Sequence, residues 1–148
     1  MSYNQLLYHI VFSTYMRRKT IDVEHDDELY SYIGGIVKHL KGFVIAINGM
    51  PDHVHLVASL PVDHPLSYYI KEIKQSTSLW LRSNSNFPDW EHWSKGYAII
   101  TCSPLAIDPV LNYVRAQKEH HKKASFEDEL RQMLSMLGIE YNPFEMMK

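Results

Sequence analysis

Two histidines separated by one residue form the clearest chemical pattern in the sequence. His53 and His55 lie in the run HVHLVASL (53–60), which is typical of a strand. Alternate side chains of a strand point to the same face, so both imidazoles project together, about 7 Å apart along the backbone. Two imidazoles at that separation can converge on one metal ion. Among nine histidines the pattern can also arise by chance, and the other histidines fit surface or rim positions equally well.

The residues around the pair favour a site on one side of the strand. Val54, Leu56, Ala58 and Leu60 face away from the histidines, toward the predicted helices, and leave the histidine face free for chemistry. A histidine-triad hydrolase would need a third histidine at position 57, which is valine. The single cysteine excludes an internal disulfide and a multi-cysteine zinc site. The pair therefore still needs a third ligand and a reacting group.

A tyrosine and a glutamine four residues apart could supply both. Tyr113 and Gln117 fall in a helix predicted from Asp108 to about Lys123, where i and i+4 side chains share a face. The Gln117 carbonyl oxygen could be a third ligand, and the Tyr113 oxygen could act as a nucleophile if it is deprotonated near a cation. Four neighbouring bases would favour the phenolate and an approaching phosphate: Arg115, Lys118, Lys122 and Lys123. Plain amphipathic packing would explain the same tyrosine, because the chain has ten.

The net charge of −2 at first disfavours a nucleic-acid partner, because phosphate binding requires lysine and arginine. The acids are concentrated, however, in residues 21–30, which carry five acids and no base, and in residues 125–148. The rest of the chain is basic, with clusters at Arg17–Lys19, at Lys71 and Lys74, and after Tyr113. These clusters can be ordinary solvated faces, but they also allow a basic face on an acidic protein.

The elements that must position these residues follow from periodicity and turn residues. Strands are predicted over 5–15, 43–47, 53–60 and 97–103, with a turn at 48–52 that makes 43–60 a hairpin. Helices are predicted from the acidic run 22–28 to about residue 41, from Pro65 to an exposed loop at 83–92, over 108–123 and over 125–137. The order β-α-β-β-α-β predicts an α+β, ferredoxin-like antiparallel sheet with two helices on one face and additional C-terminal helices.

Three segments in this order resemble a known family. They are MPDHVHLVASLP (50–61), WSKGYAIITCS (93–103) and VLNYVRAQKEHH (110–121), and they resemble the single-tyrosine, IS200-like transposases of small bacterial insertion sequences, in the HUH superfamily. His53-Val54-His55 matches the HUH element, Trp93, Gly96 and Tyr97 match an aromatic-x-x-Gly-Tyr signature, and Tyr113 and Gln117 match Tyr-x-x-x-Gln. The opening YHIVFSTYMRR (8–18) is also similar, and the tail resembles the domesticated, REP-associated branch.

The resemblance implies a mechanism. His53, His55 and Gln117 would hold Mg²⁺ or Mn²⁺, with His120 or His121 as an alternative to Gln117. Tyr113 would attack a phosphorus of single-stranded DNA and form a 5′-phosphotyrosine link, which a 3′-hydroxyl can later reverse. Family members recognise DNA hairpins and work as homodimers, in several of which the tyrosine helix of one subunit completes the other's site. Candidate contacts to the DNA backbone are Arg17, Arg18, Lys19, Arg115, Lys118 and Lys122.

Two other functions stay open: a domesticated module that binds hairpins with little strand transfer, and a metal-dependent phosphoesterase unrelated to DNA.

We expect residues 1–124 to form the catalytic domain and residues 125–148 a helical extension of that domain. The extension should pack against the body or a partner subunit, and its deletion should change oligomeric state more than metal binding. No apolar run approaches the roughly 18 residues of a membrane span, so a cytoplasmic location without membrane partners is expected.

Overall fold

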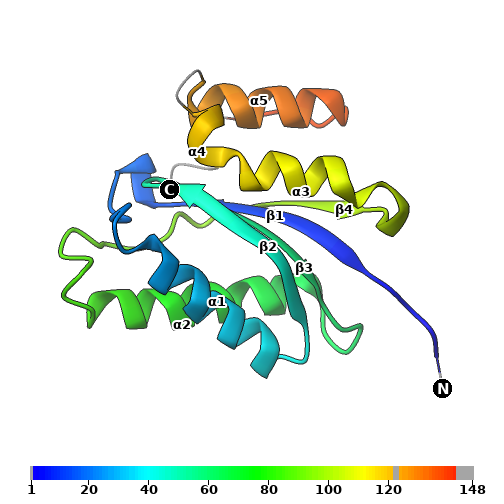
Figure 1. The fold of residues 1–148 in the computed structure, drawn as a ribbon, viewed down its shortest axis with the longest axis horizontal. Helices are drawn as coiled ribbons and strands as arrows, with labels where there is room; N and C mark the ends of the chain where they lie inside the picture. Colours follow the sequence, from blue (N-terminus) through cyan, green and yellow to red (C-terminus); the bar gives the residue numbers. More distant parts are fainter. Residues whose placement is uncertain (1, 122–123, 143–148) are drawn as a thin grey trace.

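The computed structural model describes residues 2–121 and 124–142. Its sheet contains β1 (Leu7–Ser13), β2 (Phe43–Met50), β3 (His53–Ser59) and β4 (Ala98–Cys102). The strands lie in the order β2-β3-β1-β4, and every neighbouring pair is antiparallel (Figure 1). This arrangement confirms the predicted α+β, ferredoxin-like sheet.

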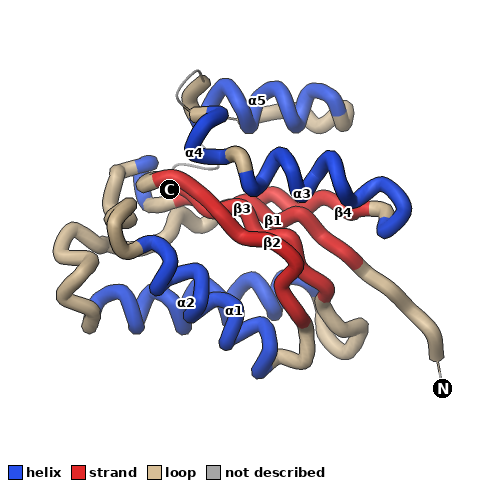
Figure 2. The backbone as a smooth tube through the Cα atoms, viewed as in Figure 1, coloured by secondary structure: helices blue, strands red, loops and turns tan. Residues whose placement is uncertain are grey.

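Helices cover both faces of the sheet (Figure 2). On one face lie α1 (Asp26–His39) and α2 (Leu66–Arg82), as predicted. On the other lie α3 (Ile107–Arg115), α4 (Gln117–His120) and α5 (Phe126–Met136). Short 3₁₀ turns occur at Tyr15–Arg17 and Pro104–Ala106. Within the described residues no helix is long and apolar enough to cross a membrane.

The alternation along β3 gives each face its own core. Val54, Leu56 and Ala58 are fully buried and belong to the larger cluster, which α1 and α2 complete. On the opposite face Val57 packs with Leu111 and Val114 of α3. The central strands β1 and β3 are therefore buried on both faces.

The expectation of a free histidine face is thus wrong. Val11 of β1 packs there with Phe126, Leu130 and Leu134 of α5, which lays the C-terminal helix over the centre of the sheet. Burial of these apolar side chains stabilises the covered arrangement. The expectation that the C-terminal segment packs against the body is confirmed for α5.

The hairpin is tighter than predicted, because Asn48 to Met50 belong to β2 and only Pro51 and Asp52 form the turn. Gly49 permits this close pairing: a Cβ atom at Gly49 would lie 2.2 Å from the His53 carbonyl oxygen. The turn-forming composition of 48–52 therefore marks the approach of two backbones rather than a long loop.

The single helix predicted over 108–123 is also wrong. It is interrupted at Ala116 (φ −92°, ψ 13°), which separates α3 from α4. The Asn48 side chain donates a hydrogen bond to the Arg115 carbonyl oxygen, at 3.0 Å, next to the interruption. Beyond it, Gln117 turns into the protein and is fully buried. Lys122 and Lys123 lie outside the described residues.

Candidate active site

The two histidines of β3 lie on the face covered by α3 to α5. Both are fully buried. The His53 Nδ1 lies 2.7 Å from the Asp52 Oδ1, and the His55 Nδ1 lies 2.7 Å from the Nε2 of His9 on β1. These contacts fix both rings and direct their Nε2 atoms away from Asp52 and His9, toward α4 and α5.

A carboxylate from α5 meets these Nε2 atoms. The Glu129 Oε1 lies 2.6 Å from the His55 Nε2, and its Oε2 lies 2.7 Å from the His121 Nε2. One ligand atom from each of His53, His55, His121 and Glu129 lies within 4.8 Å of the others. This buried group of three imidazoles and a carboxylate could hold a metal ion.

The predicted third ligand, Gln117, lies at the same place. Its Oε1 is 3.2 Å from the His53 Nε2, and its Nε2 donates to the Glu129 Oε2 at 3.3 Å. His120 lies at the rim of the cluster, with its Nε2 3.3 Å from the same Glu129 oxygen. The structure therefore brings together His53, His55 and all three residues considered for the third ligand.

The Tyr113 side chain, from α3, reaches the same carboxylate. Its half-buried ring lies 5.7 Å from the ring of His55 of the same chain, and its hydroxyl donates a hydrogen bond to Glu129. Tyr113 and Glu129 line a cavity of about 440 Å³ between α3 and α5. That volume is in the range of small-molecule sites, so a group of ligand size can reach the phenol.

The electrostatics of the site centre on Glu129. Burial alone would raise the pKa of its carboxyl group, but the His121 and His55 rings that contact it outweigh burial and lower that pKa strongly. Burial raises the pKa of Tyr113, and its hydrogen bond to Glu129 raises it further. For His121, burial opposes the charge, but the Glu129 carboxylate raises the pKa overall. Glu129 is thus an anion at neutral pH, whereas Tyr113 is a neutral phenol.

Burial keeps the rings of both His9 and His55 neutral. Burial, reinforced by repulsion from His55, lowers the pKa of His9 to about 3. Burial also lowers the pKa of His55 to about 4, although the hydrogen bond to Glu129 acts to raise it. Both values lie below the ordinary value of 6.5, so unfolding in mild acid allows both imidazoles to take up protons.

Acid should therefore destabilise the metal-free protein. Between pH 7 and pH 5 we expect the free energy of unfolding in EDTA to fall by about 1–2 kcal/mol for each of His9 and His55. The raised pKa of His121 acts in the opposite direction and offsets part of this loss. Urea titrations across this range measure the effect. His9→Asn should reduce the slope, whereas His39→Asn, at an exposed position, should not; a pH-independent wild type would contradict the assignment.

The residues predicted to contact DNA differ in their surroundings, because some are held in ion pairs within the protein and others are exposed. The guanidinium of Arg17 lies 3.1 Å from the Glu127 carboxylate and donates to the Tyr141 hydroxyl at 2.6 Å, so it holds α5. Arg18 is more exposed and pairs with Glu91. The Lys118 ammonium bonds to Asp26 and to the Gly49 carbonyl oxygen. It therefore ties α4 to α1 and β2.

Lys19 and Arg115 are exposed, and Lys122 lies outside the described residues. The expectation that Lys118 favours the phenolate of Tyr113 finds no support in its contacts, because its ammonium bonds to Asp26, Asn48 and Gly49. The groups that the structure does place against the phenol are Glu129, Gln117 and imidazoles.

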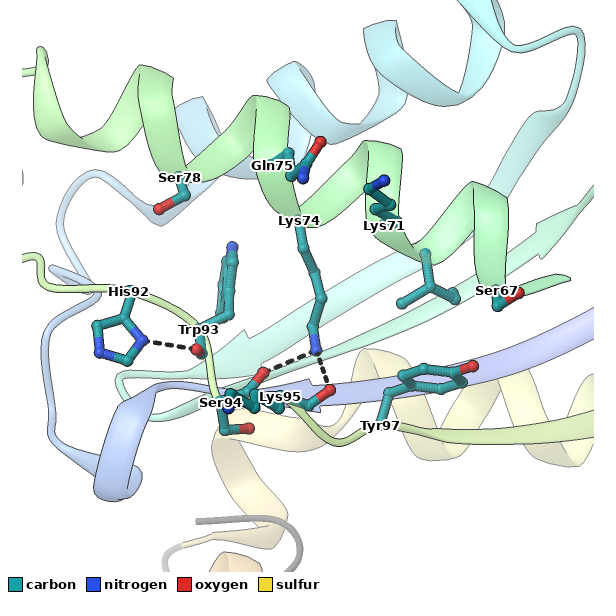
Figure 3. Close-up of a pocket in the computed structure, with 11 residues that line it drawn as sticks. Ser67, Lys71, Lys74, Gln75, Ser78, His92, Trp93, Ser94, Lys95 and Tyr97 are labelled. Atoms are coloured by element: carbon teal, nitrogen blue, oxygen red, sulfur yellow. Dashed lines mark hydrogen bonds between the residues drawn. The ribbon is translucent and has the colours of Figure 1, made fainter. Parts of the chain in front are cut away.

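A second cavity, of about 340 Å³, lies between α2 and residues 92–97 (Figure 3). Figure 3 shows the Lys74 side chain reaching from α2 to this segment, where its ammonium donates to the carbonyl oxygens of Ser94, Lys95 and Gly96. Trp93 is buried, and its Nε1 donates to the Thr77 hydroxyl, so its main role is core packing. Tyr97 is partly exposed beside Lys74.

Sequence reasoning missed Glu129 and placed His9 at the surface or rim. Phe126, Glu129, Leu130 and Leu134 are all buried on one face of α5. This spacing put an acid within an apolar stripe, which was the available signal for a buried carboxylate. His9 lies two residues before Val11 on a central strand, so the two side chains share a face, and that pattern indicated an inward-facing ring.

The chain is similar to known transposases. The model of a family described as "Transposase IS200 like" matches residues 2–117. The ISDra2 transposase TnpA of Deinococcus radiodurans is 25% identical over 122 residues, which are 78% of this chain and 86% of that protein.

Two solved structures have the same fold. One, from Deinococcus radiodurans and described as a transposase, has a TM-score of 0.58 at 22% identity, over 78% of this chain and 93% of the other. The second, a REP-associated tyrosine transposase bound to a REP hairpin, has a TM-score of 0.62 at 16% identity, over 82% of this chain and 72% of the other. Since the family model spans most of the chain and includes His53, His55, Tyr113 and Gln117, this protein belongs to the IS200-like transposases, a family of enzymes that act in DNA transposition.

Proposed function

We propose that the chain cleaves and rejoins single-stranded DNA through a 5′-phosphotyrosine link, with Tyr113 as nucleophile and His53, His55 and Gln117 as ligands of Mg²⁺ or Mn²⁺. The position of Tyr113 supports this best. Its ring lies against His55, its hydroxyl bonds to Glu129, and both Tyr113 and Glu129 line the 440 Å³ cavity. The proposed nucleophile thus lines the same cavity as a carboxylate that contacts the His55 ring.

The chemistry at Tyr113 needs positive charge beside the phenol. Attack of its oxygen on phosphorus forms the phosphotyrosine bond and breaks the bond to the 3′ oxygen, which leaves as a hydroxyl. Burial and Glu129 raise the pKa of Tyr113, so the phenol is a poor nucleophile beside an uncompensated carboxylate. A divalent cation bound at the histidines would supply the missing charge and polarise the scissile phosphate. Asp52 and His9 orient the two histidine rings.

The proposed substrate is DNA that folds into a hairpin. The similar REP-associated transposase is bound to a REP hairpin, which supports this choice. We place the backbone contacts on Arg17, Arg18, Lys19, Arg115, Lys118 and Lys122, as inferred from the sequence. Of these, Lys19 and Arg115 are exposed, whereas Arg17 and Lys118 would have to leave Glu127 and Asp26.

We further propose a homodimer, because one nucleophilic tyrosine per chain makes one cleavage and two cleavages then need two chains. Tyr113 lies beside histidines of its own chain, which supports cleavage in cis; exchange of tyrosine helices between subunits is the alternative. Residues 1–124 would form the catalytic domain and 125–148 an extension of it, as the packing of α5 on β1 supports. A hairpin-binding module without strand transfer is the competing function.

One experiment separates these functions. The purified chain is incubated with end-labelled single-stranded DNA containing a hairpin, with Mn²⁺ or with EDTA, and then denatured. A Mn²⁺-dependent adduct that survives the denaturant supports the transposase. Hairpin binding without any adduct would refute it in favour of the binding module, and an equal reaction with EDTA would refute the metal requirement.

A further inference from the structure

We propose that His53, His55, His121 and Glu129 are the ligands of the metal site, so that α5 completes the centre and Gln117 only positions its residues. This inference rests on the metal-dependent function proposed above and changes its ligand set. The family model ends at residue 117, so two of these four ligands lie beyond it. The argument depends on where each imidazole carries its hydrogen.

His53 and His121 both have the Nδ1 hydrogen committed. The His121 Nδ1 lies 2.7 Å from the Ala124 carbonyl oxygen, which can only accept a hydrogen bond. The His53 Nδ1 lies 2.7 Å from the Asp52 carboxylate, which is likewise an acceptor. A neutral imidazole has one N–H, so the Nε2 of each ring presents a lone pair.

Both lone pairs face oxygen acceptors. The His121 Nε2 lies 2.7 Å from the Glu129 Oε2, yet this buried atom makes no hydrogen bond among the described residues. The His53 Nε2 lies 3.2 Å from the Gln117 Oε1 and 3.7 Å from the Glu129 Oε1. In neutral rings these lone pairs repel the oxygens, and either a proton or a metal ion between them removes the repulsion. One divalent ion could satisfy both rings and the carboxylate together.

His55 can join the set because of His9. Without a metal the Nε2 of His55 can donate to Glu129, at 2.6 Å. When the Nδ1 of His55 donates to the Nε2 of His9 instead, at 2.7 Å, the Nε2 of His55 presents a lone pair to an ion. The four ligand atoms lie within 4.8 Å of one another, close to twice a metal–ligand bond of roughly 2.1 Å. Small side-chain adjustments would bring all four to one ion.

Gln117 has a different role. Its amide nitrogen donates to Glu129 and its carbonyl oxygen faces His53, so it bridges two of the ligands. A negatively charged carboxylate is a stronger ligand for a divalent cation than a neutral amide. Three imidazoles and one carboxylate also favour Mn²⁺ over Mg²⁺, which prefers all-oxygen sites.

The test is the Mn²⁺ affinity of the full chain, measured by calorimetry and by the rise in melting temperature on adding Mn²⁺ to metal-free protein. We expect Glu129→Gln and His121→Ala each to weaken binding by roughly tenfold or more, and Gln117→Ala by much less. Asp128→Asn, a neighbouring exposed acid of α5, is the matched control and should bind as wild type. His121→Ala keeps the test decisive if Glu129→Gln does not fold.

The outcomes distinguish this inference from the function on which it rests. If Glu129→Gln and His121→Ala bind Mn²⁺ like wild type while Gln117→Ala does not, the ligand set proposed here is refuted and the metal-dependent function survives. If the wild type binds no Mn²⁺, both fail. The visible absorption of bound Co²⁺ gives a further check, because loss of a nitrogen or oxygen ligand alters its spectrum.

Discussion

Replacing Tyr113 with phenylalanine should abolish the covalent protein–DNA adduct, with a loss of at least about three orders of magnitude in its rate of formation. The change removes one oxygen and leaves the ring beside His55 and His120. The lost hydrogen bond to Glu129 should cost only about 1 kcal/mol of stability, because the ring still fills its space. Denaturing electrophoresis of labelled DNA measures the adduct, and thermal melting verifies the fold.

Tyr97→Phe is the matched control for this substitution. Tyr97 is partly exposed and lies beside Lys74 at the other cavity, which is not lined by His53, His55 or His121 (Figure 3). It should form the adduct at the wild-type rate. An adduct formed by the Tyr113 variant would show that another residue is the nucleophile, whereas loss of the adduct in both variants would indicate a general effect on DNA binding.

Local patterns were sufficient to predict the sheet. The apolar alternation of β3 correctly separates Val54, Leu56 and Ala58 from the two histidines, and the tight turn at Pro51 and Asp52 fixes their register. Each inference depends on residues close in sequence and on the period of a strand. The order of strands and helices then leaves few possible topologies, and the ferredoxin-like arrangement is one of them.

The site could be predicted only in part, because its closure depends on distant contacts. Glu129 meets His55 across 74 positions of the chain, and no local period reveals such a contact. Similarly, the interruption at Ala116 places Gln117 against His53, where an unbroken helix was expected. The sequence predicts that deleting residues 125–148 affects oligomeric state more than metal binding, whereas the position of Glu129 in the candidate metal group predicts that the deletion also weakens metal binding.

The docking of α5 leads to the second large effect. Leu130 follows Glu129 in the chain, is fully buried, and packs with Val11 and Phe126. Leu130→Ala removes apolar contacts and leaves a cavity, so the free energy of unfolding should fall by about 2–5 kcal/mol. Urea titrations in EDTA measure this loss.

Met136→Ala serves as the control, because Met136 is 81% exposed on the same helix and its loss should change stability by no more than about 0.5 kcal/mol. If the two variants were equally stable, α5 would not be docked on the sheet in solution.

Docking also determines where Glu129 lies, since Arg17 holds only the edge of α5 through Glu127, whereas Leu130 anchors the helix on β1. Leu130→Ala should therefore weaken Mn²⁺ binding as well, although residue 130 has no ligand atom, and Met136→Ala should not.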